Sequence, residues 1–203
     1  DNGYPVFTNL ADCHVEADVV IDFASAKAVD ALLDYCVERK LPVVLCTTGL
    51  SNEQLLHVEE ASKQTAVLRS GNMSLGINTI QKLVAEAAKV LAPAGFDVEI
   101  VEKHHNQKID APSGTALMIA DAISEVMADE PQYVYDRHSV RKKRSRDEIG
   151  IHAVRGGTIV GEHDVIFAGN DEIIEINHKA MSKEIFAVGS IKAAKFIKDK
   201  PAG

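Results

Sequence analysis

The sequence contains no tryptophan and only three cysteines among its 203 residues. Those cysteines, Cys13, Cys36 and Cys46, form neither a CxxC pair nor a disulfide framework, which is typical of a protein from a reducing compartment. No apolar run approaches the roughly 18 residues that a membrane-spanning helix needs. The first five residues show neither a signal-peptide nor a transit-peptide pattern. The sequence therefore predicts a cytoplasmic protein without a membrane span.

The chain also lacks an initiator methionine, and we expect it to be a fragment or a processed product of a longer protein. Its 22 Lys and Arg against 30 Asp and Glu give a formal net charge of −8, which argues against nucleic acid or an anionic membrane as partner. With 46% hydrophobic residues the chain can bury a sizeable core, which excludes wholesale disorder. The basic run from Arg137 to Arg146 has acidic and polar flanks and is expected to be a solvated loop.

The first third of the chain alternates short apolar runs with amphipathic segments. Ser25 is expected to cap the helix after the first run, and Ser51 with Gln54 has capping-box spacing before the next helix. Short, fully apolar strands between helices imply a parallel sheet covered on both faces. The expected strands lie at residues 19–23, 42–45 and 66–68.

The remaining chain has a different pattern, which predicts an α+β region with a mixed, largely open sheet. Residues 97–102 alternate as a half-buried strand does, and two later runs joined at residues 169–171 predict an antiparallel pair. Ser182 is expected to cap a last helix that returns to the first region. The expected helices lie at 76–92, 113–127 and 183–198, and the expected antiparallel strands at 158–168 and 172–178.

The stretch from Glu99 to Ala116 concentrates the residues that carry chemistry. A strand delivers His104, His105 and Lys108 into a turn that opens directly on a helix N-terminus. Unpaired N–H groups and the helix dipole suit a carboxylate or phosphate there, and Gly114 allows close approach of a ligand. A histidine can exchange a proton near neutral pH. The pattern predicts a site for a small anionic substrate that is protonated during reaction.

The ionisable residues do not favour a metal site or a hydrolase carboxylate pair. The histidines lack metal-site spacing, and adjacent residues on a strand point to opposite faces, so no metal site is predicted. Glu99 and Glu102 lie three apart on a strand and therefore face opposite ways, which argues against a hydrolase carboxylate pair. Arg155 and His163 lie in strand-like segments and are candidates either to contact substrate or to satisfy each other. The histidines considered are His104, His105, His152, His163 and His178.

The stretch Glu99–Ala116 resembles the signature of the dihydrodipicolinate reductase family, whose members reduce 4-hydroxy-tetrahydrodipicolinate in the diaminopimelate route to lysine. Every fixed position of that pattern is met, including His104, Lys108, Asp110 and the Pro-Ser-Gly-Thr-Ala run. The resemblance extends over nearly the whole chain. Further matching segments are residues 19–23, 47–49, 71–78, 155–157, 161–163 and 186–187.

The resemblance implies a Rossmann-type doubly wound parallel sheet, incomplete at its N-terminus, and a second domain that binds substrate and builds a homotetramer. The expected nucleotide domain comprises residues 1–73 and 184–203, and the substrate domain residues 74–183. The implied reaction is hydride transfer from NADPH or NADH to the cyclic hydroxylated dicarboxylate, with loss of water. The implied partners are this small dicarboxylate and further copies of the chain, without nucleic acid or membrane.

The resemblance also assigns roles to residues. His104 would be the proton donor, and Lys108 a second donor that also holds a carboxylate. The implied substrate-binding residues are His105, Ser113, Gly114 and Thr115. The implied cofactor-binding residues are Cys46, Thr47, Thr48, Ser70, Gly71, Asn72 and Met73.

The sequence departs from the family at several points. Cys46 stands where Gly is usual, which places a thiol in the expected cofactor pocket and predicts sensitivity to oxidation; Met73 replaces the common Phe, and Lys183 the frequent Arg. The family's opening G-x-x-G-x-x-G turn, which cradles the pyrophosphate, is absent from the 203 residues. A non-catalytic dicarboxylate-binding relative or an inactive truncated fragment is therefore the alternative to a reductase. Another dehydrogenase of similar architecture fits the signature less well.

Overall fold

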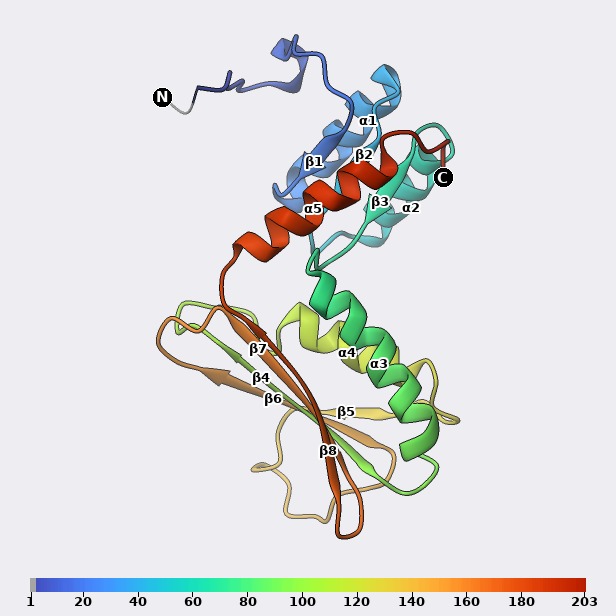
Figure 1. The fold of residues 1–203 in the computed structure, drawn as a ribbon, viewed down its shortest axis with the longest axis vertical. Coiled ribbons are helices and arrows are strands. Elements are labelled where there is room, and N and C mark those ends of the chain that lie inside the picture. The colour runs from blue at the N-terminus through green and yellow to red at the C-terminus, as the bar shows by residue number, and fades with distance from the viewer. Residues whose placement is uncertain (1–2) are drawn as a thin grey trace. The chain divides into compact units, whose positions relative to one another are not determined.

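The computed structural model of the chain describes residues 3–203, which form two compact units (Figure 1). Unit 1 comprises the residues up to Met73 together with Phe186–Gly203, and unit 2 comprises Ser74–Ile185. The assignment of nucleotide binding to the first unit and substrate binding to the second stays a prediction. Over residues 3–203, no helix is both long and apolar enough to cross a membrane.

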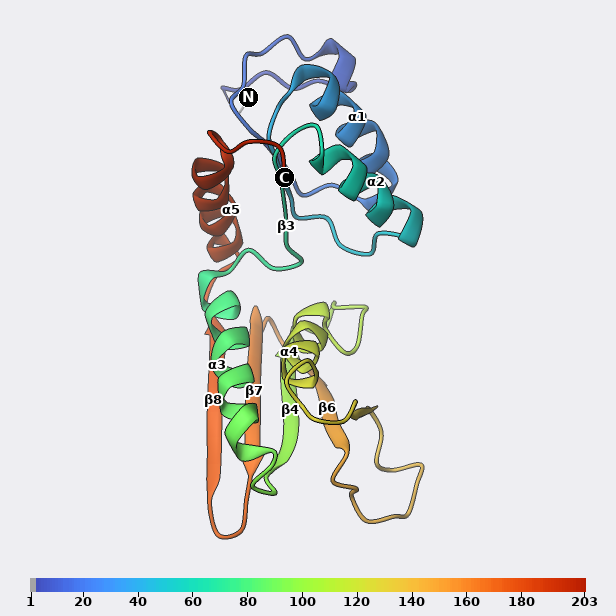
Figure 2. The ribbon, with the colours of Figure 1, turned by 90° about the vertical axis from the view of Figure 1, so that its right-hand side faces the viewer.

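Unit 1 is built on a parallel sheet of three strands in the order β1 (Val20–Asp22), β2 (Val43–Leu45) and β3 (Val67–Arg69). The helices α1 (Val29–Arg39) and α2 (Asn52–Ser62) cover one face, and α5 (Glu184–Ile197) lies on the other (Figure 2). Both faces of β2 are buried, which is why its sequence is apolar without alternation. The predicted Rossmann-type class, a parallel sheet covered on both sides, is confirmed.

The helix starts of unit 1 follow the predictions only in part. The capping box before α2 is confirmed, because the Ser51 hydroxyl accepts the Gln54 N–H and the Gln54 side chain accepts the Ser51 N–H. The predicted cap at Ser25 is wrong. A 3-10 turn (Ala26–Ala28) intervenes, and Ala28 donates its N–H to the backbone carbonyl of Ser25, so that the hydroxyl makes no cap bond and α1 begins at Val29. Another 3-10 turn, Leu10–Asp12, precedes β1.

Unit 2 holds a mixed sheet of five strands in the order β5-β6-β4-β7-β8. The central strand β4 runs parallel to β6 and antiparallel to β7, and β7 pairs with β8 as the predicted antiparallel partner. Two helices, α3 (Leu75–Leu91) and α4 (Gly114–Ser124), pack against this sheet (Figure 2). The strands are β4 (Asp97–His104), β5 (Gln132–Val134), β6 (Glu148–Arg155), β7 (Gly161–Ala168) and β8 (Ile173–Ala180).

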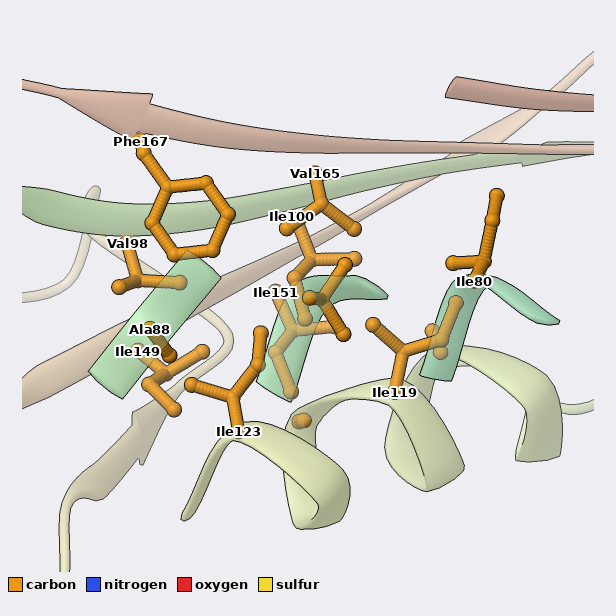
Figure 3. Packing of buried hydrophobic residues seen from close by; sticks show 13 residues of the cluster. Ile80, Ala88, Val98, Ile100, Ile119, Ile123, Ile149, Ile151, Val165 and Phe167 are labelled. Atoms are coloured by element: carbon orange, nitrogen blue, oxygen red, sulfur yellow. The ribbon is translucent and has the colours of Figure 1, made fainter. Parts of the chain in front are cut away.

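The core of unit 2 lies between one face of this sheet and the two helices (Figure 3). Burial alternates strictly along β4, so that Val98 and Ile100 face the helices while their neighbours face the opposite side. Phe167 of β7 and Ile119 and Ile123 of α4 are fully buried in the same cluster. This packing fixes which side chains at the end of β4 point beneath the N-terminus of α4.

The other face of the sheet carries a network of ion pairs. The loop between β5 and β6 folds back on it: Arg144 bonds Asp97 and Glu99, and Arg137 bonds Glu99 and Glu148. The expectation of a wholly solvated loop is therefore wrong for these two arginines, since acidic side chains of β4 and β6 hold them. These pairs join residues 11 to 47 positions apart, which local periodicity does not encode.

We expect Phe167→Ala to destabilise the protein by about 3–5 kcal/mol, because it removes the largest fully buried side chain of the core. The measurement is the midpoint of urea unfolding, followed by circular dichroism. Val90→Ala is the matched control, since Val90 is 69% exposed on α3 and its loss should change stability by less than about 0.5 kcal/mol. Equal effects of the two substitutions would contradict this assignment of the core.

Candidate active site

The end of β4 places two ionisable side chains on the helix-covered face of the sheet. Glu102 and His104 lie two residues apart and are both buried, as the period of a strand requires. The sheet register adds two more groups to this face: His163 of β7 lies opposite Glu102, and Arg155 of β6 lies opposite His104. Four ionisable side chains from three strands therefore meet beneath the start of α4.

Glu102 is the centre of this cluster, with no exposed surface and four hydrogen-bond donors around it. Arg155 donates from Nη1 to Oε2 and from Nη2 to Oε1, both at 2.7 Å. The Ser113 backbone N–H donates to Oε1 at 3.0 Å, and His104 Nδ1 lies 2.6 Å from Oε2. Each carboxylate oxygen therefore meets two donors, which fills the acceptor positions of an ionised carboxylate.

The carboxyl group of Glu102 is ionised in this setting. Burial by itself would raise its pKa, but the hydrogen bonds from His104, Arg155 and the Ser113 N–H outweigh burial and lower the pKa to about 2. A buried charge without partners would cost several kcal/mol, so this carboxylate depends on the groups that surround it.

Ser113 connects this cluster to the helix. It is the N-cap of α4, because its hydroxyl oxygen accepts the Ala116 N–H at 3.1 Å. The same hydroxyl lies 3.0 Å from His163 Nε2. Burial and the nearby His104 lower the pKa of His163 to about 4, so His163 is neutral at physiological pH. The rings of His104 and His163 meet edge to face, with centroids 5.3 Å apart.

The loop after β4 carries the predicted lysine. Lys108 Nζ lies 2.8 Å from both carboxylate oxygens of Asp110, and Arg155 Nη2 donates to the Asp110 carbonyl at 2.7 Å. These bonds hold the loop against the end of β6. His105 is half-buried at the start of this loop. Lys108, His104 and His105 thus lie within one short segment.

The N-terminus of α4 is the accessible part of this region. Gly114 is exposed, and a Cβ added there would meet nothing within 4 Å. The neighbouring Thr115 is half-buried. The positive end of the helix dipole and the Lys108 side chain both favour an anion at this position. The arrangement can hold a carboxylate and offer it a proton donor.

A second candidate region lies at the carboxyl edge of the sheet in unit 1. The ends of β1 and β2 are in register there, and the Thr47 hydroxyl donates to the Asp22 carboxylate at 2.5 Å. The Ser70 hydroxyl donates to the Asn72 carbonyl at 2.8 Å, which shapes the turn after β3. A Cβ added at Gly189 of α5 would lie 1.7 Å from the Met73 carbonyl oxygen, so only glycine allows the helix to pack against this turn.

This edge is where a dinucleotide cofactor would be held. Ligands of open parallel sheets bind at the carboxyl ends of the strands, and small polar residues occupy the turns here. Cys46, Thr47, Asn72 and Met73 are buried, whereas Thr48 and Gly71 are exposed. The glycine-rich turn that would hold a pyrophosphate is not part of the 203 residues.

Comparison with known proteins gives these sites a family context. Two sequence models of dihydrodipicolinate reductase match the chain, the N-terminal one over residues 1–73 and the C-terminal one over residues 76–203. The chain belongs to the dihydrodipicolinate reductase family. It is similar to the 4-hydroxy-tetrahydrodipicolinate reductase of Caldanaerobacter subterraneus subsp. tengcongensis, with 60% identity over 96% of the chain and 76% of that relative.

Other members of the dihydrodipicolinate reductase family are similar too. The 4-hydroxy-tetrahydrodipicolinate reductase of Clostridium tetani is 53% identical over 98% of the chain and 78% of its own length. Among solved structures, the dipicolinate-bound dihydrodipicolinate reductase from Paenisporosarcina sp. TG-14 matches with a TM-score of 0.67 and 28% identity. That match covers 89% of the chain and 70% of the other chain. The predicted family and fold are thereby confirmed.

The structure groups the predicted site residues of this reductase family by unit. In unit 2 it brings His104, His105, Lys108 and Gly114 to the end of β4 and the start of α4. Ser113 is 2% exposed, and its N–H and hydroxyl are engaged by Glu102, His163 and Ala116. These hydrogen bonds make Ser113 part of the internal network, and its predicted contact with substrate stays a prediction.

Sequence reasoning missed Glu102, although a signal existed. The period-2 rule that separated Glu102 from Glu99 also places Glu102 on the same face as His104. Arg155 and His163 do not satisfy each other as considered, because Arg155 bonds Glu102 whereas His163 bonds Ser113. Among the residues described here, no group of three or more His, Cys, Asp or Glu side chains is placed to hold a metal ion.

Cys46 differs from the expectation of an oxidation-sensitive thiol. It is 8% exposed, and its Sγ lies 3.8 Å from the Val44 carbonyl oxygen. Burial, with a smaller contribution from Asp22, raises its pKa to about 11. The reactive thiolate form is therefore scarce at neutral pH. Cys36 is fully buried, and burial raises its pKa to about 11 as well.

We expect only Cys13 to react quickly with a chromogenic disulfide reagent in the native protein near neutral pH, because Cys36 and Cys46 are buried and protonated. The measurement is the number of thiols titrated before and after unfolding. Cys13→Ser should abolish the fast native reaction, and Cys46→Ser should leave it unchanged. A fast phase lost in Cys46→Ser would show that Cys46 is accessible.

Proposed function

We propose that this chain catalyses the NADPH- or NADH-dependent reduction of 4-hydroxy-tetrahydrodipicolinate to tetrahydrodipicolinate, the reaction implied by its family, in the diaminopimelate route to lysine. The observation that carries this proposal is the paired His104, set beside Lys108 and the exposed N-terminus of α4. This arrangement combines a proton donor with a site for an anion. The three free cysteines agree with a reaction in the cytoplasm.

The substrate is a dicarboxylate, and unit 2 offers charges of the opposite sign. In the proposal, Lys108 holds one carboxylate together with the N-terminus of α4. His105, Gly114 and Thr115 contact the substrate, and Ser113 holds the helix start in place. The dipicolinate named for the related structure is likewise a small dicarboxylate, which supports this substrate class.

The cofactor is assigned to the carboxyl edge of the unit 1 sheet. When bound, the reduced nicotinamide supplies the hydride of the reaction. The residues of this chain would hold and orient it through the turns after β2 and β3. They are Cys46, Thr47, Thr48, Ser70, Gly71, Asn72 and Met73.

The proton balance gives His104 its role. Reduction consumes one hydride and one proton and releases one water, so a proton donor must accompany the hydride. In the proposal, protonated His104 supplies this proton, and Lys108 is the second donor. Glu102 and Arg155 keep the His104 ring in place while the proton leaves.

The decisive experiment is the oxidation of NADPH and of NADH by the 203-residue chain with freshly generated 4-hydroxy-tetrahydrodipicolinate. Substrate-dependent oxidation supports a reductase and shows which nicotinamide it prefers. Absence of oxidation, together with binding of pyridine-2,6-dicarboxylate that does not depend on the cofactor, would favour a dicarboxylate-binding protein without this activity.

We expect His104→Ala to lower kcat by roughly 10²–10⁴-fold, because a general acid contributes about this much. Lys108→Ala should be at least as damaging, since it removes both a charge and a proton donor. His57→Ala is a matched control on the surface of unit 1, where His57 pairs with Asp30 and Asp34. Near-native turnover of His104→Ala would contradict the role of His104.

The chain is also proposed to form a homotetramer through unit 2. The sheet face that carries the ion pairs of Glu99, Arg137 and Arg144 has no helix on it among the described residues, and the proposal assigns the contact between copies to this face. Light scattering coupled to size exclusion should give four times the monomer mass. Charge reversal at the exposed Glu175 of β8 should lower that mass. A monomer at micromolar concentration would contradict this assembly.

A further inference from the structure

The hydrogen of a neutral histidine can lie on either ring nitrogen. The groups around His104 determine which of its two nitrogens carries it. Its Nδ1 lies 2.6 Å from Glu102 Oε2, inside a cluster of donors. We propose that Glu102 is a positioning residue, which keeps a proton on His104 Nδ1 and makes Nε2 the atom that transfers a proton. This inference rests on the proposed function for its catalytic meaning, but the position of the proton can be measured without turnover.

The donor count around Glu102 carries the argument. The Arg155 guanidinium and the Ser113 backbone N–H can only donate hydrogen bonds, and three such bonds reach the carboxylate. The charged, bidentate Arg155 guanidinium and the Ser113 N–H keep Glu102 ionised, and an ionised carboxylate can only accept. His104 Nδ1 must therefore be the donor of the fourth bond. Neutral His104 then carries its hydrogen on Nδ1 and a free electron pair on Nε2.

The opposite side of the ring is kept open by a glycine. A Cβ added at Gly161 would lie 3.1 Å from His104 Nε2 and 3.4 Å from Cδ2, which is tighter than most contacts of a methyl group. Gly161 therefore leaves space beside the nitrogen that is not bound to Glu102. His104 itself is 9% exposed, so access to Nε2 is narrow and depends on this space.

The remaining ionisable groups near His104 come from four strands and one loop, and their charges partly cancel. Arg155 compensates the charge of Glu102, and His163 adds no charge because it is neutral at physiological pH. Lys108 is compensated by Asp110. His104 of β4 and His163 of β7 face each other. The other ionisable groups around these two rings are Glu102 of β4, Arg155 of β6, His178 of β8, and Lys108 and Asp110 of the loop.

The transfer step balances with this arrangement. Imidazolium His104 releases the proton from Nε2 to the reacting substrate, the Nε2–H bond breaks, and the hydrogen on Nδ1 stays bonded to Glu102. The product is the neutral tautomer that the carboxylate already stabilises, so neither the ring nor the second hydrogen has to move. A proton from solvent restores the imidazolium for the next cycle.

Nitrogen-15 NMR of histidine-labelled protein tests the position of the proton directly. His104→Gln identifies the His104 signals by their loss. For neutral His104, we expect a pyrrole-type Nδ1 and a pyridine-type Nε2. The opposite assignment, or a mixture of tautomers, would overturn the proposal. An inactive chain would overturn the proposed function but leave the position of this proton intact, whereas near-native activity of His104→Ala would overturn proton transfer from Nε2.

Glu102→Gln then tests the cause, with Glu99→Gln as the matched control on the opposite face of the same strand. An amide offers one accepting oxygen and an NH2 group that donates, so Glu102→Gln can place an N–H group against His104 Nδ1 and no longer requires a hydrogen on that nitrogen. The nitrogen-15 signals of His104 should therefore show loss of the pure Nδ1–H tautomer in Glu102→Gln and no change in Glu99→Gln. An unchanged tautomer in Glu102→Gln would contradict the role of Glu102.

Gly161→Ala provides a second variant in case Glu102→Gln does not fold. The added methyl presses on Nε2 and leaves the bond between Nδ1 and Glu102 in place. We expect kcat to fall at least tenfold while the NMR tautomer is unchanged. Wild-type kcat in Gly161→Ala would overturn the assignment of Nε2 as the transferring atom.

Discussion

The ionised carboxylate of Glu102 is the interaction on which the architecture of the site depends. It is fully buried, and a buried charge is tolerated only when donors surround it. The donors come from β4, β6 and the start of α4, so satisfying one charge fixes three elements relative to one another. Removing Arg155 would leave Glu102 as a buried charge without its bidentate partner.

The alternation of a β-strand separates two kinds of chemistry within unit 2. Residues of β4 with even numbers face the helices and lead from an apolar core to Glu102 and His104. Residues with odd numbers face the other side, where Glu99 pairs with Arg137, Arg144 and His152. The eight residues of β4 thus place Glu102 and His104 on one face of the sheet and the ion pairs of Glu99 on the other.

The proposed substrate is an anion although the chain is acidic overall. The chain's net charge of −8 is spread over the surface, whereas the charges near His104 are paired locally. Because Lys108 and Asp110 compensate each other, as do Arg155 and Glu102, the helix dipole remains as a source of positive potential at the start of α4. The net charge therefore argues against nucleic acid and anionic membranes as partners. The proposed binding of a small dicarboxylate depends instead on the groups at the start of α4.

The sequence alone determined the features that depend on neighbouring residues. Apolar runs gave the parallel strands of unit 1, the Ser51–Gln54 spacing gave a capping box, and the signature from Glu99 to Ala116 gave the family. At Ser25 the same local reasoning failed, because a 3-10 turn satisfied the backbone before the helix began. A helix cap formed by residues close in the chain was thus predictable at Ser51, where no 3-10 turn precedes the helix, but not at Ser25, where one does.

Only the tertiary structure decided which distant residues meet. Arg155 reaches Glu102 from 53 positions away, and His163 reaches Ser113 from 50 positions away. These contacts depend on the order β5-β6-β4-β7-β8 and on the register of its strands, which local periodicity does not encode. The sequence could name His104 as a proton donor, but the nitrogen that faces Glu102 follows from the sheet, because only the folded sheet brings the donors around that carboxylate together.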